Sequence, residues 1–365
     1  MKNPRILFDD GNQIKLGTGI GKFSLNLYNS IKRAGYNITL VEQDNTAAGS
    51  RTRQRIQYIK KINSREYQNY ISENYDVVLY ANYAVPFVKN KKVKYVGVIA
   101  DMVSFLYPDT LPKVYAFYSR MMIRNTMRRA DLVFTISDSV RKEILDKFPN
   151  RESKTVFTWL GINDNIFVLD SSEGYENPCL NGISSDPFFL FVSTVEKRKN
   201  VGMVIDAFIK LKKTEARAGN YKLVIVGRPG YGFEEFVDTA AKSNYKDDIV
   251  FPGFASDNDC NKLYNHAKAF IFPTVYEGFG FAQVECMRCH LPIILSDIPT
   301  NREISREYGL FFDLNDTESL VSQMGCIVND LYDYKKYDAI ADNYIEDFNW
   351  DSIAKQYMAF IESKL

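Results

Sequence analysis

The most restrictive feature of the sequence is a glycine loop that lies between a buried strand and a helix. The apolar run Ala269–Phe272 predicts a strand that is covered on both faces. The loop Gly278-Phe279-Gly280 follows, and the pattern then predicts a helix over Phe281–Cys289 and a second buried strand over Pro292–Leu295. Such units build parallel α/β sheets, whose ligands bind beyond the carboxyl ends of the strands.

The loop itself predicts a ligand with hydroxyl and phosphate groups. Gly278 and Gly280 have no Cβ, so their backbone N–H groups can approach a ligand closely. The following helix directs its positive end to the same place, which favours an anion. Glu277 can accept hydrogen bonds from sugar hydroxyls. Glu285 lies on the helix and faces the same ligand site only if that side of the helix is turned toward it. The spacing alone leaves a surface turn with two solvated carboxylates as the alternative.

This stretch resembles the Glu-x7-Glu region of family 4 glycosyltransferases. The resemblance rests on Glu277, the glycine loop and Glu285, followed by Leu291, Pro292, Ser296, Pro299 and Glu303. Members of that family are retaining, nucleotide-sugar-dependent enzymes with the GT-B fold. The resemblance implies two doubly wound, Rossmann-like α/β domains that face a cleft, with a C-terminal helix that crosses back to the first domain. It also implies that Glu277 holds the donor sugar and Glu285 the nucleotide ribose.

Composition indicates a globular protein with room for two cores. The chain has 365 residues, of which 45% are hydrophobic. No apolar run approaches the length of about 18 residues that a membrane-spanning helix needs. The N-terminus does not resemble a signal peptide, and five cysteines without disulfide-like spacing fit a reducing compartment. We therefore expect a cytoplasmic protein.

The charge is distributed unevenly along the chain. Residues 1–170 contain 26 Lys and Arg against 16 Asp and Glu, whereas residues 171–365 contain 20 against 29. Several of the basic residues crowd two segments of the first half: Arg51, Arg53, Arg55, Lys60, Lys61 and Arg65, and then Arg120, Arg124, Arg128 and Arg129. This imbalance predicts a peripheral contact with the anionic inner face of the cell membrane. A solvated helix face is the alternative, and no nucleic-acid-binding module is recognised.

The first half predicts a doubly wound parallel sheet with a glycine loop after its first strand. Apolar runs alternate with helical patterns at Ile6–Phe8, Ile38–Val41, Val77–Tyr80, Tyr95–Ile99 and Leu132–Ile136. The loop Gly17–Lys22 fails the P-loop pattern, because Phe23 stands where Ser or Thr is required. It is similar to the Thr-Gly-Ile-Gly segment of the family, which implies that Gly19 and Gly21 lie against the donor diphosphate and the acceptor.

A departure from the family lies at Ala100. The segment Val98–Asp101 resembles the one in which family members end a strand with His-Asp, where the His lies near the 6-hydroxyl of the donor sugar. Asp101 matches and is carried over as a catalytic residue, but Ala100 replaces the His. One explanation is loss of activity. Another is a donor without a 6-hydroxyl, such as a 6-deoxyhexose, beside which a buried His would lack a hydrogen-bond partner.

The second half predicts a clamp for a diphosphate. Arg198 and Lys199 follow the apolar run Phe188–Val192 and precede a helix, a place where cations can bind phosphates. A solvated basic turn is the alternative. The run Arg198-Lys199-Asn200 matches the Arg-Lys-Asn of the family, whereas Thr194 replaces an upstream Arg that many members have.

Two further residues are candidates for contact with the nucleotide. Gly227 ends the next apolar run, and Phe254 lies in a region that matches the family's base-binding segment, although a structural aromatic is equally consistent with the pattern. The haem-like spacing of Cys286–His290 is set aside, because the chain shows no export signal. Asp257-Asn258-Asp259 precedes a helical pattern and is interpreted as a cap, so no metal is expected.

These observations predict four segments. They are an acceptor-binding domain at 1–170, a linker at 171–186, a donor-binding domain at 187–347 and a C-terminal helix at 348–365; Trp159–Asn163 is expected to be the last strand of the first domain and its exit. The expected reaction moves a mannose-, rhamnose- or glucose-type hexose or 6-deoxyhexose, with retention, from a GDP-, dTDP- or UDP-linked sugar. The expected acceptor is a glycan or a polyprenyl-diphosphate-linked glycan of a surface polysaccharide, and no cofactor is required. A catalytically silent sugar-nucleotide-binding subunit is the main alternative, and an epimerase is a third.

Overall fold

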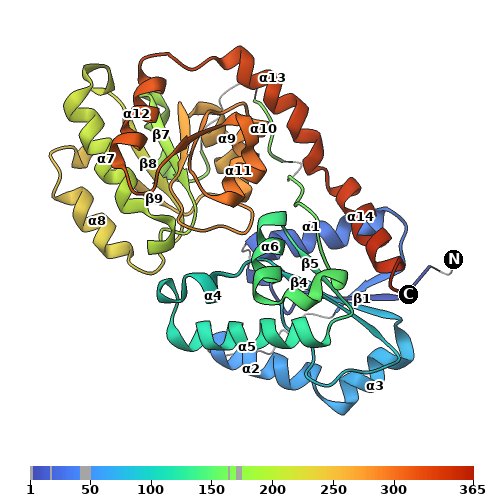
Figure 1. Ribbon diagram of the computed structural model, residues 1–365. Helices are drawn as coiled ribbons and strands as arrows, with labels where there is room; N and C mark the ends of the chain where they lie inside the picture. Colours follow the sequence, from blue (N-terminus) through green and yellow to red (C-terminus); the bar gives the residue numbers. More distant parts are fainter. Residues whose placement is uncertain (1–2, 17–18, 42–50, 163–164, 170–174) are drawn as a thin grey trace. The chain divides into compact units, whose positions relative to one another are not determined.

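The computed structural model describes residues 3–16, 19–41, 51–162, 165–169 and 175–365 (Figure 1). The chain divides into two compact units. Unit 1 comprises residues 1–161 and 348–365, and unit 2 comprises residues 162–347. Within the described residues, no helix combines the length and the apolar character needed to cross a bilayer.

Unit 1 is built on a parallel sheet with six strands among its described residues, in the order β2-β1-β3-β4-β5-β6. The strands are β1 (Ile6–Asp9), β2 (Ile38–Leu40), β3 (Val77–Tyr80), β4 (Lys94–Ile99), β5 (Leu132–Thr135) and β6 (Thr155–Phe157). The helices are α1 (Gly19–Arg33), α2 (Arg51–Ile62), α3 (Arg65–Asn74), α4 (Val103–Leu106), α5 (Lys113–Arg129), α6 (Asp138–Lys147) and α14 (Trp350–Glu362). The order reverses between β1 and β3, which makes that point the topological switch of this sheet.

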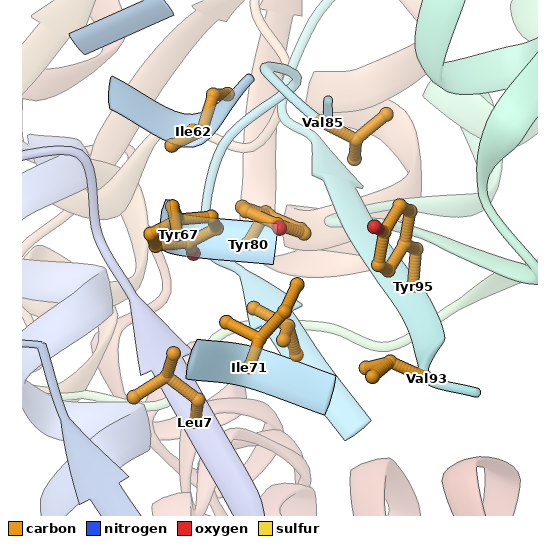
Figure 2. Close-up of a cluster of buried hydrophobic side chains, with 9 residues drawn as sticks. Leu7, Ile62, Tyr67, Ile71, Tyr80, Val85, Val93 and Tyr95 are labelled. Carbon is orange, nitrogen blue, oxygen red and sulfur yellow. The ribbon is translucent and has the colours of Figure 1, made fainter. Parts of the chain in front are cut away.

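The core of unit 1 forms because its central strands are apolar on both faces. Every residue of β1, β3 and β5 is buried. Figure 2 shows one cluster of this core, in which Tyr80 and Tyr95 meet edge to face with ring centroids 5.8 Å apart. Tyr67, from α3, lies in the same cluster and donates its hydroxyl hydrogen bond to Asp9 Oδ2 at 3.0 Å.

The C-terminal helix α14 belongs to unit 1. Asn349 caps it by accepting hydrogen bonds from the backbone N–H groups of residues 351 and 352 at 3.0 Å. The ring of Tyr357 stacks on Phe134 of β5, with centroids 3.9 Å apart. Trp350 lies so close to Gly161 that a Cβ there would be 2.4 Å from Trp350 Cγ, so only glycine fits. The last helix therefore completes the core of the first half of the chain.

Unit 2 has a second parallel sheet, with six strands among its described residues in the order β12-β11-β10-β7-β8-β9. The strands are β7 (Phe188–Val192), β8 (Lys222–Val226), β9 (Ile249–Gly253), β10 (Ala269–Phe272), β11 (Ile293–Ser296) and β12 (Gly309–Phe312). The helices are α7 (Val201–Thr214), α8 (Phe233–Ala241), α9 (Asp257–His266), α10 (Phe281–Arg288), α11 (Pro299–Ser305), α12 (Thr317–Val328) and α13 (Tyr334–Ile345). Here the order reverses between β7 and β10.

The region between the two sheets differs from the sequence prediction. The expected strand at Trp159–Asn163 is wrong, because the last strand of the first sheet is β6; the Trp159 ring instead packs on Phe348, with centroids 5.6 Å apart. The described residues of 162–186 belong to unit 2, in place of a free linker. The N–H groups of Phe167 and Glu176 donate to the side chains of Asn261 and Asp259, at 3.0 and 2.7 Å, which fixes this segment on α9. Residues 171–174 of the predicted linker lie outside the described residues.

Candidate functional site

The switch point of unit 2 is where two parallel neighbours, β7 and β10, lead into loops on the same edge of the sheet. Ligands of open α/β sheets bind at such a point, beyond the carboxyl ends of the strands. The loop after β7 runs to Asn200, and the loop after β10 runs to Gly280. The two loops meet, since the N–H of Val275 donates to the carbonyl of Arg198 at 3.0 Å.

Four charged side chains gather where the loops meet, and we call Glu196, Arg198, Lys199 and Glu277 the charged cluster. Glu277 Oε1 accepts from Arg198 Nη1 at 3.0 Å and also from Lys199 Nζ. Arg198 Nη2 donates to Glu196 Oε1 at 2.7 Å. The exposed fractions of the side chains of Glu277, Arg198 and Lys199 are 12%, 20% and 8%. The cluster is therefore an ion-pair network that is mostly shielded from water.

Burial and charge act in opposite directions on Glu277. Burial by itself would raise the pKa of its carboxyl group, but the charges and hydrogen bonds of Lys199 and Arg198 outweigh burial and lower that pKa. The pKa of the Lys199 ammonium is lowered by burial, and Glu277 offsets this only in part. We assign an ionised Glu277, because two cationic groups donate to one of its oxygens.

Neighbouring hydroxyl groups hold the cluster in place. Thr274 Oγ1 donates to the carbonyl of Tyr276 at 2.9 Å and lies 3.3 Å from Glu277 Oε1. Thr300 Oγ1, from α11, donates to the carbonyl of Glu277 at 2.8 Å. Glu196, Thr274 and Thr300 are members of the site that were not predicted from the sequence. For Glu196 a signal was present, since it lies two residues before Arg198 in the same loop; the two threonines carry no motif.

The glycine loop begins α10 as predicted. Gly280 has a φ of +81°, a left-handed conformation that favours glycine, and a Cβ there would lie 2.5 Å from Gln283 Nε2. Gln283 Nε2 donates to the carbonyl of Phe279 at 2.6 Å and so stiffens the loop. Gly278 and Phe279 are buried, whereas Gly280 is half-buried. The contact of these three residues with a ligand stays a prediction.

Glu285 lies inside α10 and is only 8% exposed. Its Oε2 accepts a hydrogen bond from the Tyr264 hydroxyl of α9 at 2.8 Å. Burial and the nearby Glu285 carboxylate raise the pKa of Tyr264 well above its usual value, so the phenol remains a donor. Tyr264 is thus a further residue of the candidate site, and it fixes the orientation of the carboxylate.

The ends of β8 and β9 carry Gly227 and Phe254. The N–H of Gly227 donates to the carbonyl of Gly253 at 2.8 Å, and a Cβ on Gly227 would lie 1.7 Å from the carbonyl oxygen of Ser193. Close packing of two backbones therefore accounts for this glycine, and its ligand role stays a prediction. Phe254 is 56% exposed, and the Arg228 guanidinium lies 4.7 Å from its ring centroid. An exposed aromatic ring at this edge can stack on a flat ligand.

The predicted site residues of unit 1 lie in the first turn of α1 and just after β4. Gly19 begins α1, and Gly21 packs so closely on Gln13 that a Cβ would be 2.3 Å from its carbonyl oxygen. Gly17 and Thr18 of that loop lie outside the described residues. Asp101 follows β4, and its Oδ1 accepts from the N–H of Val103 at 3.1 Å, which helps to begin α4. A cavity of about 60 Å³ lies beyond the ends of β1 and β2, beside α2, and is lined in part by Asp9, Asp10, Tyr58 and Lys61.

The acidic pattern Asp257-Asn258-Asp259 is structural. Ser256 caps α9, and the two carboxylate oxygens of Asp259 accept the N–H groups of Glu176 and Asn177 at 2.7 and 3.0 Å. Asp259 therefore binds backbone and holds the segment before β7. No group of three metal-ligating side chains is found in the part of the chain that the structure describes.

The second half of the chain is similar to a known family of proteins. Residues 180–346 match the family model described as glycosyl transferases group 1. The O-antigen chain mannosyltransferase B of Escherichia coli is 25% identical over 256 residues, which cover 70% of this chain and 64% of that protein. The O-antigen chain mannosyltransferase RfbU of Salmonella typhimurium is 26% identical over 283 residues, which cover 77% and 71%. The chain thus spans less than two thirds of the length of the first of these relatives.

Solved structures share the fold. Anabaena Alr3699/HepE, solved in complex with UDP and glucose, has a TM-score of 0.71 at 16% identity and covers 99% of this chain and 100% of its own. WaaG, described as a glycosyltransferase involved in lipopolysaccharide biosynthesis, has a TM-score of 0.69 at 15% identity and covers 96% and 98%. The two parallel sheets with their helices are the GT-B fold, as the sequence predicted.

Proposed function

Because residues 180–346 match the glycosyl transferases group 1 family model, in a chain with the GT-B fold, we propose that this protein is a retaining hexosyltransferase. The proposed reaction moves a hexose or 6-deoxyhexose from a nucleotide-diphosphate sugar to a glycan acceptor. The observation that carries this proposal is the charged cluster at the switch point of unit 2, where Arg198, Lys199 and Glu277 meet.

In the proposed mechanism, the cluster exchanges partners when the donor binds. Without a ligand, Arg198 and Lys199 are neutralised by Glu277 and Glu196. A diphosphate is the stronger acceptor for both cations, so it takes over their hydrogen bonds and frees Glu277 Oε1 for the hydroxyls of the sugar. The cations then stabilise the charge that develops on the leaving diphosphate, a role that needs no metal ion. Donor binding and sugar positioning are coupled through this one carboxylate.

The remaining donor contacts are assigned from the family 4 resemblance and supported by position. Glu285, oriented by Tyr264, would hold the ribose, and Phe254 would lie against the base. Gly227, Gly278, Phe279 and Gly280 would bring backbone close to the donor, while Gly19, Gly21 and Asp101 of unit 1 rest on the resemblance alone. The nucleotide is proposed to be GDP, dTDP or UDP. Since Ala100 replaces the family His, we favour a 6-deoxyhexose over a sugar with a 6-hydroxyl.

The acceptor is proposed to be a lipid-linked glycan of a surface polysaccharide. Two relatives are O-antigen chain mannosyltransferases, which supports this class of pathway. We assign the acceptor to the N-terminal part and the donor to the C-terminal part, and we place the protein in the cytoplasm with a peripheral contact at the inner face of the cell membrane. The basic first half of the sequence supports that contact.

A thermal-shift panel of nucleotides and nucleotide sugars without added metal tests the proposal. One nucleotide should stabilise the wild type by about 2.7 kcal/mol at a hundredfold excess over its Kd, and the Glu285→Ala variant should lose this shift. Release of nucleoside diphosphate from the matching sugar donor then separates an enzyme from a silent binding subunit, the alternative that Ala100 raises. A shift without turnover on any donor or acceptor favours the silent subunit, and no shift with any nucleotide contradicts the donor site.

A further inference from the structure

Unit 1 contains a polar cavity that the proposed mechanism does not use. The cavity has a volume of about 60 Å³ and lies beyond the ends of β1 and β2, beside α2. A water molecule needs roughly 10–15 Å³ of such space, so the cavity has room for about four water-sized groups. A whole hexose is too large for it. One edge of a sugar ring, with a hydroxymethyl arm and the neighbouring hydroxyl, is of matching size.

Two buried carboxylates form one side of the cavity. Asp9 ends β1 and Asp10 follows it, and their exposed fractions are 2% and 1%. Asp9 Oδ1 accepts from the Tyr58 hydroxyl and Oδ2 from the Tyr67 hydroxyl, each at 3.0 Å. The two oxygens of Asp10 accept backbone N–H groups of the following loop at 3.2 and 2.8 Å. Burial raises the pKa of Asp9, but three groups donate hydrogen bonds to it, so we assign an ionised carboxylate.

One face of α2 forms the other side of the cavity. Four of its side chains line the space: Gln54, Gln57, Tyr58 and Lys61. Their spacings of three and four residues place them on one side of the helix. An amide side chain both donates and accepts hydrogen bonds, and the Tyr58 ring adds apolar surface. Val41, which follows β2, adds a small apolar wall. The lining therefore offers donors, acceptors and apolar contact within one small space.

The charge of the lining selects between ligands. Two buried carboxylates face one ammonium group, that of the exposed Lys61, so negative charge predominates. A phosphate or carboxylate group of a ligand would be repelled, because water screens buried charges poorly. A neutral sugar hydroxyl can donate to a carboxylate oxygen and accept from an amide. The cavity therefore does not suit the diphosphate of a nucleotide sugar, and it does suit an uncharged sugar.

We propose that this cavity binds the edge of a neutral sugar in the acceptor. Ligands of parallel sheets bind beyond the carboxyl ends of the strands, and the cavity lies at that edge of unit 1. In one respect the inference rests on the proposed function, since it makes the bound sugar part of the glycan that receives the transferred residue. Sugar binding itself does not depend on the donor. The negative lining excludes a uronic acid from this position of the acceptor.

A saturation-transfer NMR titration of the full chain with methyl glycosides tests the proposal. The probes are the methyl glycosides of glucose, galactose and mannose, the corresponding uronic acids, and the glycoside of an amino sugar. At least one neutral glycoside should bind at least about tenfold more tightly than its uronic acid, because the lining repels a carboxylate. Val41→Phe should remove this binding, since the larger ring fills the cavity. Gln57→Ala should weaken it roughly two- to tenfold, because one hydrogen bond is lost.

Matched control variants lie elsewhere in unit 1. Val88→Phe and Gln356→Ala make the same substitutions at exposed positions outside the cavity, and both should bind the glycoside as the wild type does. Gln57 is itself exposed, so Gln57→Ala tests the site even if Val41→Phe fails to fold.

Three results would overturn the proposal. They are no binding of any glycoside, equal binding by the cavity variants and their controls, and binding of the uronic acids or the amino sugar as tight as that of the neutral sugars. Nucleotide binding by the wild type is measured separately. Sugar binding without nucleotide binding would contradict the proposed transferase and leave the cavity as a sugar site, whereas nucleotide binding without sugar binding would overturn the cavity site alone.

Discussion

Replacing Glu277 by Gln should destabilise unit 2, because the variant keeps the shape of the side chain and removes its charge. Lys199 and Arg198 would then face no carboxylate at the position where Oε1 now accepts from both. Breaking a fully buried pair costs about 3–5 kcal/mol. Arg198 retains Glu196 and the carbonyl of Tyr276, and burial already lowers the pKa of Lys199, which eases loss of its proton. We therefore expect a smaller loss, about 2–3 kcal/mol.

Calorimetric unfolding measures this loss. A change of that size lowers the Tm of a domain of this length by about 4–12 °C. Adding Lys199→Met to Glu277→Gln should recover part of the stability, since no uncompensated cation then remains buried beside the glutamine. Glu234→Gln, at an exposed position of α8, is the matched control and should leave the Tm unchanged.

The same variant has a pH signature. The pKa of Glu277 is lowered in the folded protein, so its contribution is present above the unfolded value of about 4.3 and is lost as the pH falls through the folded pKa. The difference in stability between wild type and Glu277→Gln should therefore shrink below about pH 4. An unchanged Tm at neutral pH would refute the reasoning, and so would a difference that persists undiminished in acid.

Three further predictions concern other parts of the fold. Gly227→Ala should lower the free energy of unfolding in urea by more than about 3 kcal/mol, because the new Cβ would meet a backbone carbonyl. Gly253→Ala should lower it by about 1–2 kcal/mol, because Gly253 has a φ of +82° but open space around it. Trp350→Ala should destabilise unit 1 by about 3–5 kcal/mol and leave the unfolding of unit 2 unchanged in calorimetry; equal effects on both would contradict the assignment of α14. Tyr264→Phe should weaken nucleotide binding by roughly tenfold in titration calorimetry, because Glu285 loses the hydrogen bond from the Tyr264 hydroxyl. An unchanged affinity would contradict the assignment of Glu285 to the ribose.

The sequence predicted the strands that are buried on both faces. The runs at Val77–Tyr80, Phe188–Val192 and Ala269–Phe272 coincide with β3, β7 and β10, because consecutive apolar side chains admit few other arrangements. The edge strands β6 and β12 were not predicted. Each is short and carries half-buried residues, so its pattern does not differ from that of a loop.

The sequence also selected three of the four residues of the charged cluster, Arg198, Lys199 and Glu277, but not their contacts. Arg198 and Glu277 are 79 positions apart, and they meet because β7 and β10 are neighbours in the sheet. The order of the whole sheet determines which strands that are distant in sequence become neighbours. Local sequence patterns do not encode that order. The contacts of Thr274 and Thr300 with Glu277 follow from the same strand order, and no sequence motif predicts them.

Turnover of nucleotide sugars by the purified protein, without added metal, tests whether the charged cluster is a transferase site. The measured quantity is nucleoside diphosphate released from each donor of a GDP-, dTDP- and UDP-sugar panel, for the wild type and for Glu277→Gln. We expect the wild type to release the nucleotide of one donor, with a 6-deoxyhexose favoured. The variant should release it at a rate lower by at least about a hundredfold. Release from no donor, or equal release by both proteins, would contradict a transferase site at the charged cluster.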